Sequence, residues 1–246
     1  MSVIYCHNEG NPITFIHNPK AAGTSIADWI WSSVGYKNTI TYRNHWTLEE
    51  VRDMMKQDHG ITDLGTTFGV VRNPYDRAVS AYAYLRVRFE GLYGWQNICS
   101  EQERIHNFHE LDQGFEYFLK SQEYYKRKYE VMMPQLFWLK GVDRICKMET
   151  LLQDFDPIAG LYKVQKRFKI PFHNVSHRTD DWKAFYNNTC KAIIENHFGE
   201  DIETFGYDFD MPIKQFGRDQ YWSKKMAKDK EQVKQEVEDL NNLGSN

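Results

Sequence analysis

The sequence predicts a three-layer α/β sandwich, in which helices flank a central and mainly parallel β-sheet. Two β-rich runs, residues 13–17 and Thr66–Val71, each pass through a short turn into a stretch with helical spacing of apolar residues. Strands that alternate with helices in this way are typical of a parallel sheet covered on both faces. The chain has 246 residues, of which 41% are hydrophobic, so it is long enough to form one large domain with a substantial core.

The first strand covers residues 13–17 and ends at an Asn-Pro pair, which stops a strand. Apolar residues then recur at helical spacing over residues 26–34. Thr24 or Ser25 is a suitable N-cap for this helix. The first unit is therefore a strand, a tight loop and a helix.

The second helix begins at a capping box, Thr47-Leu-Glu-Glu50. Trp46 and Val51 are placed to form the hydrophobic staple around it. His45 lies one residue before the staple, on the loop that leads into this helix.

The second strand, Thr66–Val71, leads through Arg72 into a third helix. Asn73 can cap this helix, and Pro74 suits its first position. Helical spacing continues to about residue 88.

Beyond the third helix the pattern is weaker. Residues 91–109 show no periodicity, so we expect a loop or a mobile flap there. Later segments are predicted as helices at 115–119, 132–139, 151–155 (interrupted by Pro157) and 182–198, and as a strand at 143–147. Residues 1–213 should form the folded domain, and the charged residues 214–246 a solvated helix or tail.

Charge and composition narrow the class of protein. The formal net charge is −3, which argues against wholesale binding to nucleic acid or to a membrane surface. No apolar run has the length that spans a bilayer, and the polar N-terminus lacks the features of a signal peptide. The scattered cysteines are expected to be reduced, and no histidine or cysteine cluster predicts a metal site. We therefore expect a soluble, cytoplasmic protein.

The turn after the first strand has the features of a phosphate-binding loop. A strand that turns sharply into a helix directs backbone N–H groups and the helix dipole toward one point, where an anion is favoured. Gly23 permits close backbone approach, and Lys20 adds a mobile charge. Hydroxyl groups come from Thr24 and Ser25. The alternative is a surface turn with an incidental lysine.

This loop is P-loop-like but is not the G-x-x-x-x-G-K-S/T motif, because its lysine precedes its glycine. The strand Thr66–Val71 ends in Arg72, where a magnesium-dependent enzyme of that class would need an aspartate. These differences favour a metal-free phosphate site over a nucleoside triphosphatase.

A second anion site is predicted where the second strand ends. Arg72 can hold a phosphate bidentately, and Ser80, two turns into the following helix, can add a hydroxyl. Arg77 could share that site, or it could form a salt bridge with Asp76 or Glu90. For Arg72 itself the alternative is a structural ion pair. Two such sites, each after a strand, indicate a ligand with phosphate at both ends.

These segments resemble the sulfotransferases that use 3′-phosphoadenosine 5′-phosphosulfate (PAPS), particularly their carbohydrate branch. Residues 16–25 resemble the 5′-phosphosulfate loop of that family, although Asn18 and Ala21 depart from its more usual isoleucine and threonine. Residues 71–80 resemble its 3′-phosphate loop almost without a break. Weaker matches occur at residues 134–141, 145–155 and 201–209.

The resemblance implies a reaction and a set of ligand contacts. A sulfuryl group would move from PAPS to a hydroxyl acceptor, a carbohydrate by this likeness, and 3′-phosphoadenosine 5′-phosphate (PAP) would be released. The 5′-phosphosulfate would be held by Lys20, Ala22, Gly23, Thr24 and Ser25, and the 3′-phosphate by Arg72 and Ser80. Ser176 and Arg178, in a loop that the family closes over the nucleotide, would add donors.

Sulfuryl transfer needs a cation on the leaving phosphate and a base for the acceptor hydroxyl. We expect Lys20 to be that cation and His45 to be the base, because imidazole titrates close to neutral pH. Glu49, Glu50 and His17 are the reserve candidates, and His45 could instead be a histidine that hydrogen-bonds to backbone. No metal is required.

Two other functions remain open. A P-loop nucleotide kinase-like phosphotransferase would bind ATP with magnesium, and a nucleotide-binding module without catalysis would tolerate loss of both Lys20 and His45. No motif in the sequence identifies the acceptor. The resemblance to the carbohydrate branch of the sulfotransferases implies a saccharide. The charged tail could pair two copies of the chain, so a homo-oligomer is possible.

Overall fold

The computed structural model describes residues 3–6, 11–42, 45–90, 99–126, 129–161 and 181–211. The chain divides into two compact units, Met1–Pro212 and Ile213–Asn246, and the described residues all belong to the first. The charged tail 214–246 therefore lies outside the described residues. Within the described part, no helix is long and apolar enough to cross a membrane.

The centre of the first unit is a five-stranded sheet in the order β3-β1-β2-β4-β5. The strands are β1 (Val3–Cys6), β2 (Ile13–Ile16), β3 (Thr39–Tyr42), β4 (Thr66–Val71) and β5 (Arg144–Lys147). The pairs β2–β4 and β4–β5 are parallel, whereas β1 is antiparallel to both of its neighbours. Four strands therefore run in one direction, which confirms the prediction of a mainly parallel sheet. The strands β1 and β3 were not predicted.

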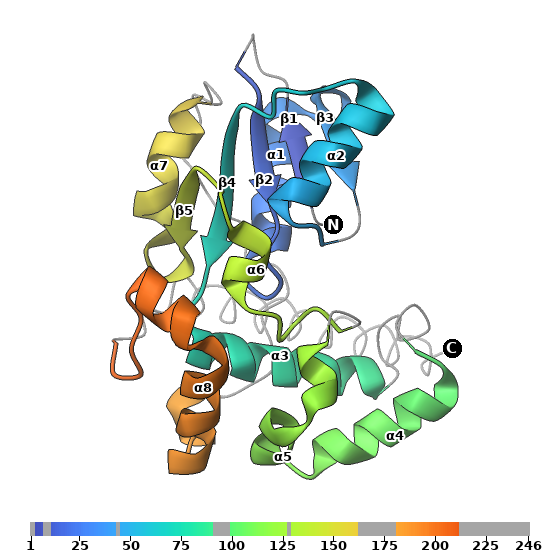
Figure 1. Cartoon of the computed structure of the whole chain (residues 1–246), viewed down its shortest axis with the longest axis vertical. Helices are drawn as coiled ribbons and strands as arrows, with labels where there is room; N and C mark the ends of the chain where they lie inside the picture. The colour runs from blue at the N-terminus through green and yellow to red at the C-terminus, as the bar shows by residue number, and fades with distance from the viewer. Residues whose placement is uncertain are drawn as a thin grey trace, which may run out of the picture. The chain divides into compact units, whose positions relative to one another are not determined.

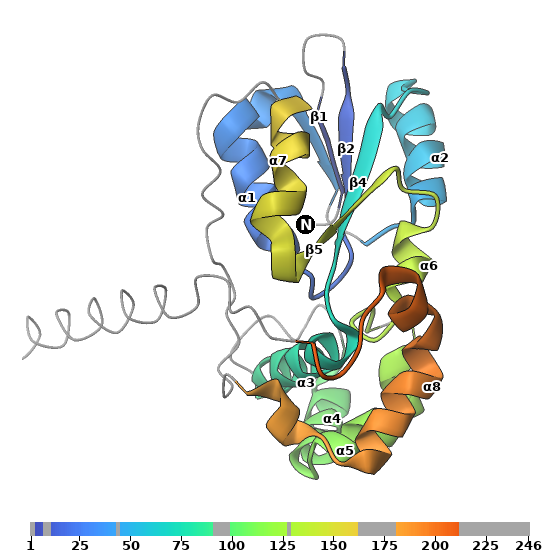
Figure 2. The ribbon, with the colours of Figure 1, turned by 90° about the vertical axis from the view of Figure 1, so that its left-hand side faces the viewer.

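Helices cover both faces of this sheet, as the three-layer prediction requires (Figures 1 and 2). The helices α1 (Gly23–Val34) and α7 (Leu151–Leu161) pack on one face, where their apolar residues join the cluster that contains Phe15 and Phe68. The helices α2 (Leu48–His59) and α6 (Gln135–Leu139) pack on the other face, together with Val71. Alternate residues of β1 enter the two clusters, as the period of a strand dictates.

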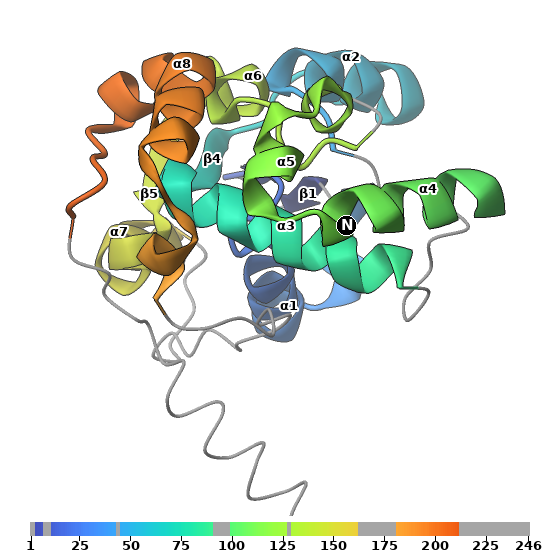
Figure 3. The ribbon, with the colours of Figure 1, turned by 90° about the horizontal axis from the view of Figure 1, so that it is seen from below.

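The remaining helices gather beyond the carboxyl ends of the parallel strands (Figures 1 and 3). They are α3 (Pro74–Phe89), α4 (Glu101–Asp112), α5 (Phe115–Lys120) and α8 (Asn188–Phe205). The first of them, α3, contacts α4, α5 and α8. In open α/β sheets, ligands bind outside the carboxyl ends of the strands, so α3 lies at the edge where a ligand is expected.

The helix α4 contradicts the predicted loop over residues 101–109. Residues 91–98 of that prediction lie outside the described residues. The Ser100 side chain accepts from the backbone N–H of Glu103, whose carboxylate accepts from the backbone N–H of Ser100 in return. Only Asn107 and Leu111 of this helix are buried, so its sequence carries almost no apolar period. The capping box was the signal that could have predicted it.

Helix α7 also differs from the prediction. Helix α7 continues through Pro157 although proline removes one helical hydrogen bond. Phe155 and Ile158, on either side of that proline, are both buried in the core, and this packing holds the two halves together. The capping box at Thr47 and the Asn73 N-cap of α3 are confirmed.

Candidate active site

The first anion loop, residues 17–25, joins β2 to α1 and has an unusual backbone. Lys20 and Ala22 both adopt a left-handed conformation, with φ of 66° and 58°. Such turns direct successive N–H groups into a concave nest that binds anions. Ala22 is the N-cap of α1 and makes no side-chain capping bond. The prediction of Thr24 or Ser25 as N-cap is therefore wrong, because the left-handed turn at Ala22 starts the helix at Gly23.

Gly23 is required by a contact inside the protein. A Cβ atom at this position would lie 1.7 Å from Nε2 of His17, so a side chain there would require the buried His17 ring to move. The His17 imidazole is itself buried and stacks on Phe15 with ring centroids 5.8 Å apart. From the sequence, we expected Gly23 to let a ligand approach the backbone closely. The structure shows a second reason for a glycine, which is that the His17 ring packs against the start of α1.

The Lys20 side chain extends toward α3. Its Nζ lies over the Tyr84 ring, 4.0 Å from the centroid, and the Arg88 guanidinium lies 5.1 Å from the same centroid. Cation–π contacts of this kind are weak at accessible sites, on the order of 0.5–1 kcal/mol. Tyr84 therefore orients two cations near the first anion loop, a role that the sequence did not predict.

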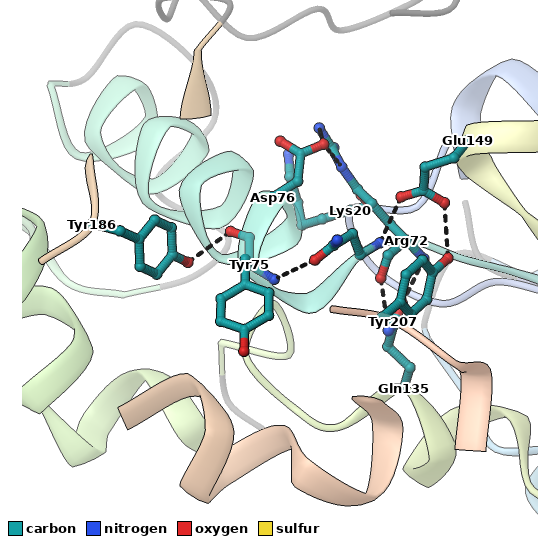
Figure 4. A network of polar contacts seen from close by, with 9 residues as sticks. Lys20, Arg72, Tyr75, Asp76, Gln135, Glu149, Tyr186 and Tyr207 are labelled. Carbon is teal, nitrogen blue, oxygen red and sulfur yellow. Dashed lines mark hydrogen bonds and ion pairs between the residues drawn. The ribbon is translucent and has the colours of Figure 1, made fainter. Parts of the chain in front are cut away.

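The second anion loop, residues 71–80, contacts the first. The Arg72 guanidinium donates through Nε and Nη2 to Asp76, at 2.8 and 2.7 Å, and through Nη1 to the backbone carbonyl of Lys20 at 3.3 Å (Figure 4). The structural ion pair that the sequence offered as the alternative role of Arg72 is thus present, with Asp76 as the partner. At the same time, the guanidinium joins the two loops directly.

Arg77 is a second link between distant segments. It is fully buried, and it donates to the carbonyls of Pro19 at 3.0 Å and Met133 at 2.8 Å. These hydrogen bonds go to backbone carbonyls, whereas the sequence suggested a carboxylate partner, because the first loop and the turn at Met133 pass close to the guanidinium. A share of Arg77 in the anion site stays a prediction. Burial lowers the pKa of Arg77 to about 10, so the guanidinium stays charged at neutral pH.

Ser80 is buried on the same helix. Its neighbours on one face of α3 are Arg77, three residues before it, and Tyr84, four residues after it. Both neighbours contact the first anion loop, at Pro19 and Lys20 respectively. The hydroxyl of Ser80 therefore belongs to the face of α3 that is turned toward that loop.

Gln135 fixes the two loops to α6. Its Oε1 accepts from Asn18 Nδ2 at 2.9 Å. The same oxygen accepts from the backbone N–H of Arg72 at 2.9 Å, and Nε2 donates to the carbonyl of Arg72 at 2.9 Å (Figure 4). Asp201 holds this residue in turn, because it accepts from the backbone N–H of Gln135 at 2.7 Å. In the sequence, residues 134–141 stood out only because they resemble a segment of the sulfotransferase family. No local pattern indicated that Gln135 would hold the two loops.

Glu149 supports the second anion loop from the 3-10 helix η4 (Met148–Thr150), which directly follows β5. Its carboxylate accepts from the backbone N–H of Asn73 at 2.7 Å and from the Tyr207 hydroxyl at 2.8 Å (Figure 4). Burial raises the pKa of Glu149, and these hydrogen bonds and the charge of Arg72 offset only part of that rise. The folded protein therefore binds a proton at Glu149 more readily than the unfolded chain does.

Glu149→Gln should make stability less dependent on pH. A raised carboxyl pKa means that wild type loses stability as the pH rises from about 4.5 through the folded-state value. The glutamine keeps one acceptor for Asn73 and one polar group for Tyr207, and it carries no charge. The variant should therefore gain a few degrees of Tm on wild type between pH 4.5 and neutral pH, as followed by thermal denaturation. A Tm difference that stays constant over this range would contradict the assignment.

His45 is placed beside the first anion loop. Its ring centroid lies 4.6 Å from that of His17 and 5.9 Å from that of Trp138. Its Nδ1 hydrogen-bonds to a carboxylate oxygen of Glu130. This partner is a side chain, whereas the alternative interpretation of His45 expected a backbone partner. Of the reserve bases, Glu49 is exposed and Glu50 closes the capping box of α2.

The structure thus brings together the predicted residues of both loops and places His45 next to them. Ser176 and Arg178 lie outside the described residues. Gln135, Tyr84 and Glu130 were missed, because each acts through a contact with residues far away in the sequence.

An α/β sandwich with two anion loops at the carboxyl ends of neighbouring parallel strands defines a class of proteins that bind phosphorylated ligands. The chain belongs to the sulfotransferase family, whose family model matches residues 5–208. It is therefore a transferase of sulfuryl groups, and the resemblance drawn from the two loops is confirmed at the level of the family. Among curated proteins and among solved structures, none matches the chain.

Proposed function

We propose that this sulfotransferase uses PAPS as its donor and transfers the sulfuryl group to a hydroxyl of a saccharide. The observation that carries the proposal is the contact between the Arg72 guanidinium and the carbonyl of Lys20. This contact places the second anion loop against the first at the carboxyl ends of β2 and β4. A donor with phosphate groups at both ends of one nucleotide suits two such loops.

The donor sets of the two loops fit PAPS. The first loop offers the nest at Lys20–Ala22 and the N-terminus of α1, which suit the 5′-phosphosulfate. The second offers Arg72 and Ser80 for the 3′-phosphate. The pair of Arg72 with Asp76 leaves the guanidinium oriented, because two of its nitrogens are fixed on one carboxylate oxygen.

In the reaction, PAPS supplies the sulfuryl group. The ammonium group of Lys20 balances the negative charge that develops on the leaving phosphate. His45 removes the proton of the acceptor hydroxyl, and its position next to His17 supports this role, since His17 packs onto Gly23 at the start of α1. The chemistry that we propose uses no metal.

The choice of a saccharide rests on the resemblance of residues 16–25 and 71–80 to the carbohydrate branch. An acceptor screen with labelled PAPS tests it. Incorporation into sugars, and not into phenols or other small alcohols, is the expected result.

Thermal denaturation with ligands tests the donor. PAP at about 100 times its Kd should stabilise the protein by about 2.7 kcal/mol, which raises Tm by about 5–10 °C. ATP with magnesium should give a much smaller rise. The Arg72→Ala variant should lose most of the PAP effect, whereas Arg52→Ala, an exposed arginine of α2, should keep it.

Stabilisation by ATP that depends on magnesium, without stabilisation by PAP, would favour the kinase-like alternative. Binding of PAP with no transfer to any acceptor would favour a module that binds nucleotide without catalysis.

A further inference from the structure

Glu130 forms a polar contact that the sequence did not suggest. Its carboxylate oxygen Oε2 hydrogen-bonds to Nδ1 of His45, which lies 85 residues earlier in the chain. Both side chains are partly buried, with 20% of His45 and 30% of Glu130 exposed. The pair therefore lies at the surface of the site, where an acceptor can reach the imidazole.

The backbone of Glu130 is held in a left-handed conformation, with φ of 59°. In the described ranges only Lys20 and Ala22, both in the first anion loop, share this property among residues other than glycine. Such a conformation is strained for a residue with a side chain and persists only where the surroundings impose it. Here the turn is closed by the bond from Met133 N–H to the Glu130 carbonyl at 3.2 Å. Arg77 anchors the turn through the carbonyl of Met133.

The contact decides which nitrogen of His45 is available. A neutral imidazole carries a proton on one nitrogen and accepts on the other. A carboxylate at Nδ1 favours the proton there, so Nε2 is left as the acceptor. The ring is also placed against His17, whose own ring packs on Gly23. Two ring contacts thus connect His45 to the start of α1.

We propose that Glu130 is a positioning residue that prepares His45 for catalysis, an inference that rests on the proposed function. Its carboxylate accepts the Nδ1–H, so Nε2 takes the proton of the acceptor hydroxyl as the new O–S bond forms. The S–O bond to the leaving phosphate breaks, and its electron pair stays on the PAP product. Glu130 stabilises the imidazolium ion that results, and the proton then passes to solvent.

The experiment compares Glu130→Gln, Glu130→Gly and His45→Ala in the full chain. Glu130→Gln should lower kcat about tenfold or more, with the KM for PAPS and the PAP-induced rise in Tm unchanged. Glu130→Gly should lower kcat further while Tm stays within about 2 °C of wild type, because glycine adopts φ of 59° without strain. Glu200→Gln, an exposed glutamate of α8, is the matched control.

The double variant separates positioning from independent effects. If Glu130 acts through His45, His45→Ala combined with Glu130→Gly should be no slower than His45→Ala alone. Additive losses of kcat would overturn the inference. So would a Glu130→Gly variant with normal kcat and a Tm lowered by several degrees, since that result describes a purely structural ion pair.

Other outcomes identify a failure of the proposed function. Full turnover in His45→Ala would remove the base and the inference with it. An absence of PAP-induced stabilisation in wild type would overturn PAPS as donor, whatever the Glu130 variants do. Loss of activity in His45→Ala together with normal activity in Glu130→Gln and Glu130→Gly would refute the inference alone.

Discussion

Lys20→Ala should lower kcat by about 10²–10³-fold, the effect of removing one group that stabilises charge in a transition state. The affinity for PAP should fall about tenfold as well, because a charged donor to the phosphate is lost. Alanine preserves the backbone of the loop, since Ala22 already adopts nearly the same left-handed conformation as Lys20. The loss can therefore be assigned to the ammonium group.

Steady-state kinetics with PAPS and PAP titrations provide the two measurements. The cation–π contact with Tyr84 that this variant removes is worth on the order of 1 kcal/mol at an accessible site. The Tm of the variant should therefore stay close to that of wild type. Lys56→Ala, an exposed lysine of α2, serves as the control. A kcat within twofold of wild type in Lys20→Ala would show that another cation stabilises the leaving group.

Arg77→Met should destabilise the protein by about 3 kcal/mol, because two buried carbonyl groups lose a charged donor. The carbonyls are those of Pro19 and Met133, and methionine fills much of the space without replacing the hydrogen bonds. For a chain of this length the loss corresponds to a fall in Tm of about 6–12 °C. PAP affinity should also fall, since the first anion loop is no longer fixed to α3.

The matched control is Arg86→Met on the same helix. The Arg86 side chain is 37% exposed and pairs with the exposed carboxylate of Asp112, so its removal should change Tm by less than about 3 °C. Equal Tm values for the two variants would mean that the buried guanidinium does not hold the loop. Urea denaturation at two protein concentrations would confirm that the difference is intramolecular.

Local chemistry allowed much of the fold and the two anion loops to be predicted. The capping box at Thr47 and the Asn73-Pro74 pair specify helix starts through contacts within four residues. The strands β2 and β4 were recognisable because both are buried and end at a clear stop or a helix cap. Where neighbouring residues determine the structure, the sequence pattern was sufficient.

The remaining features depend on partners that are distant in the sequence. The strand β3 pairs with β1, from which it is separated by more than 30 residues. The Glu130–His45 contact and the hydrogen bonds of Arg77 span 85 and more than 50 residues. No spacing within the sequence encodes such contacts. The same holds for Gln135, whose amide reaches Asn18 across 117 residues.

The role of Gln135 has a consequence for how the protein matures during synthesis. Both anion loops are complete in sequence by Ser80, yet their anchor is on α6. A nascent chain that ends before Gln135 carries both loops but lacks the amide that binds Asn18 of the first loop and Arg72 of the second. Binding competence should therefore arise in one late, cooperative step, when the middle of the chain docks onto strands that emerged much earlier.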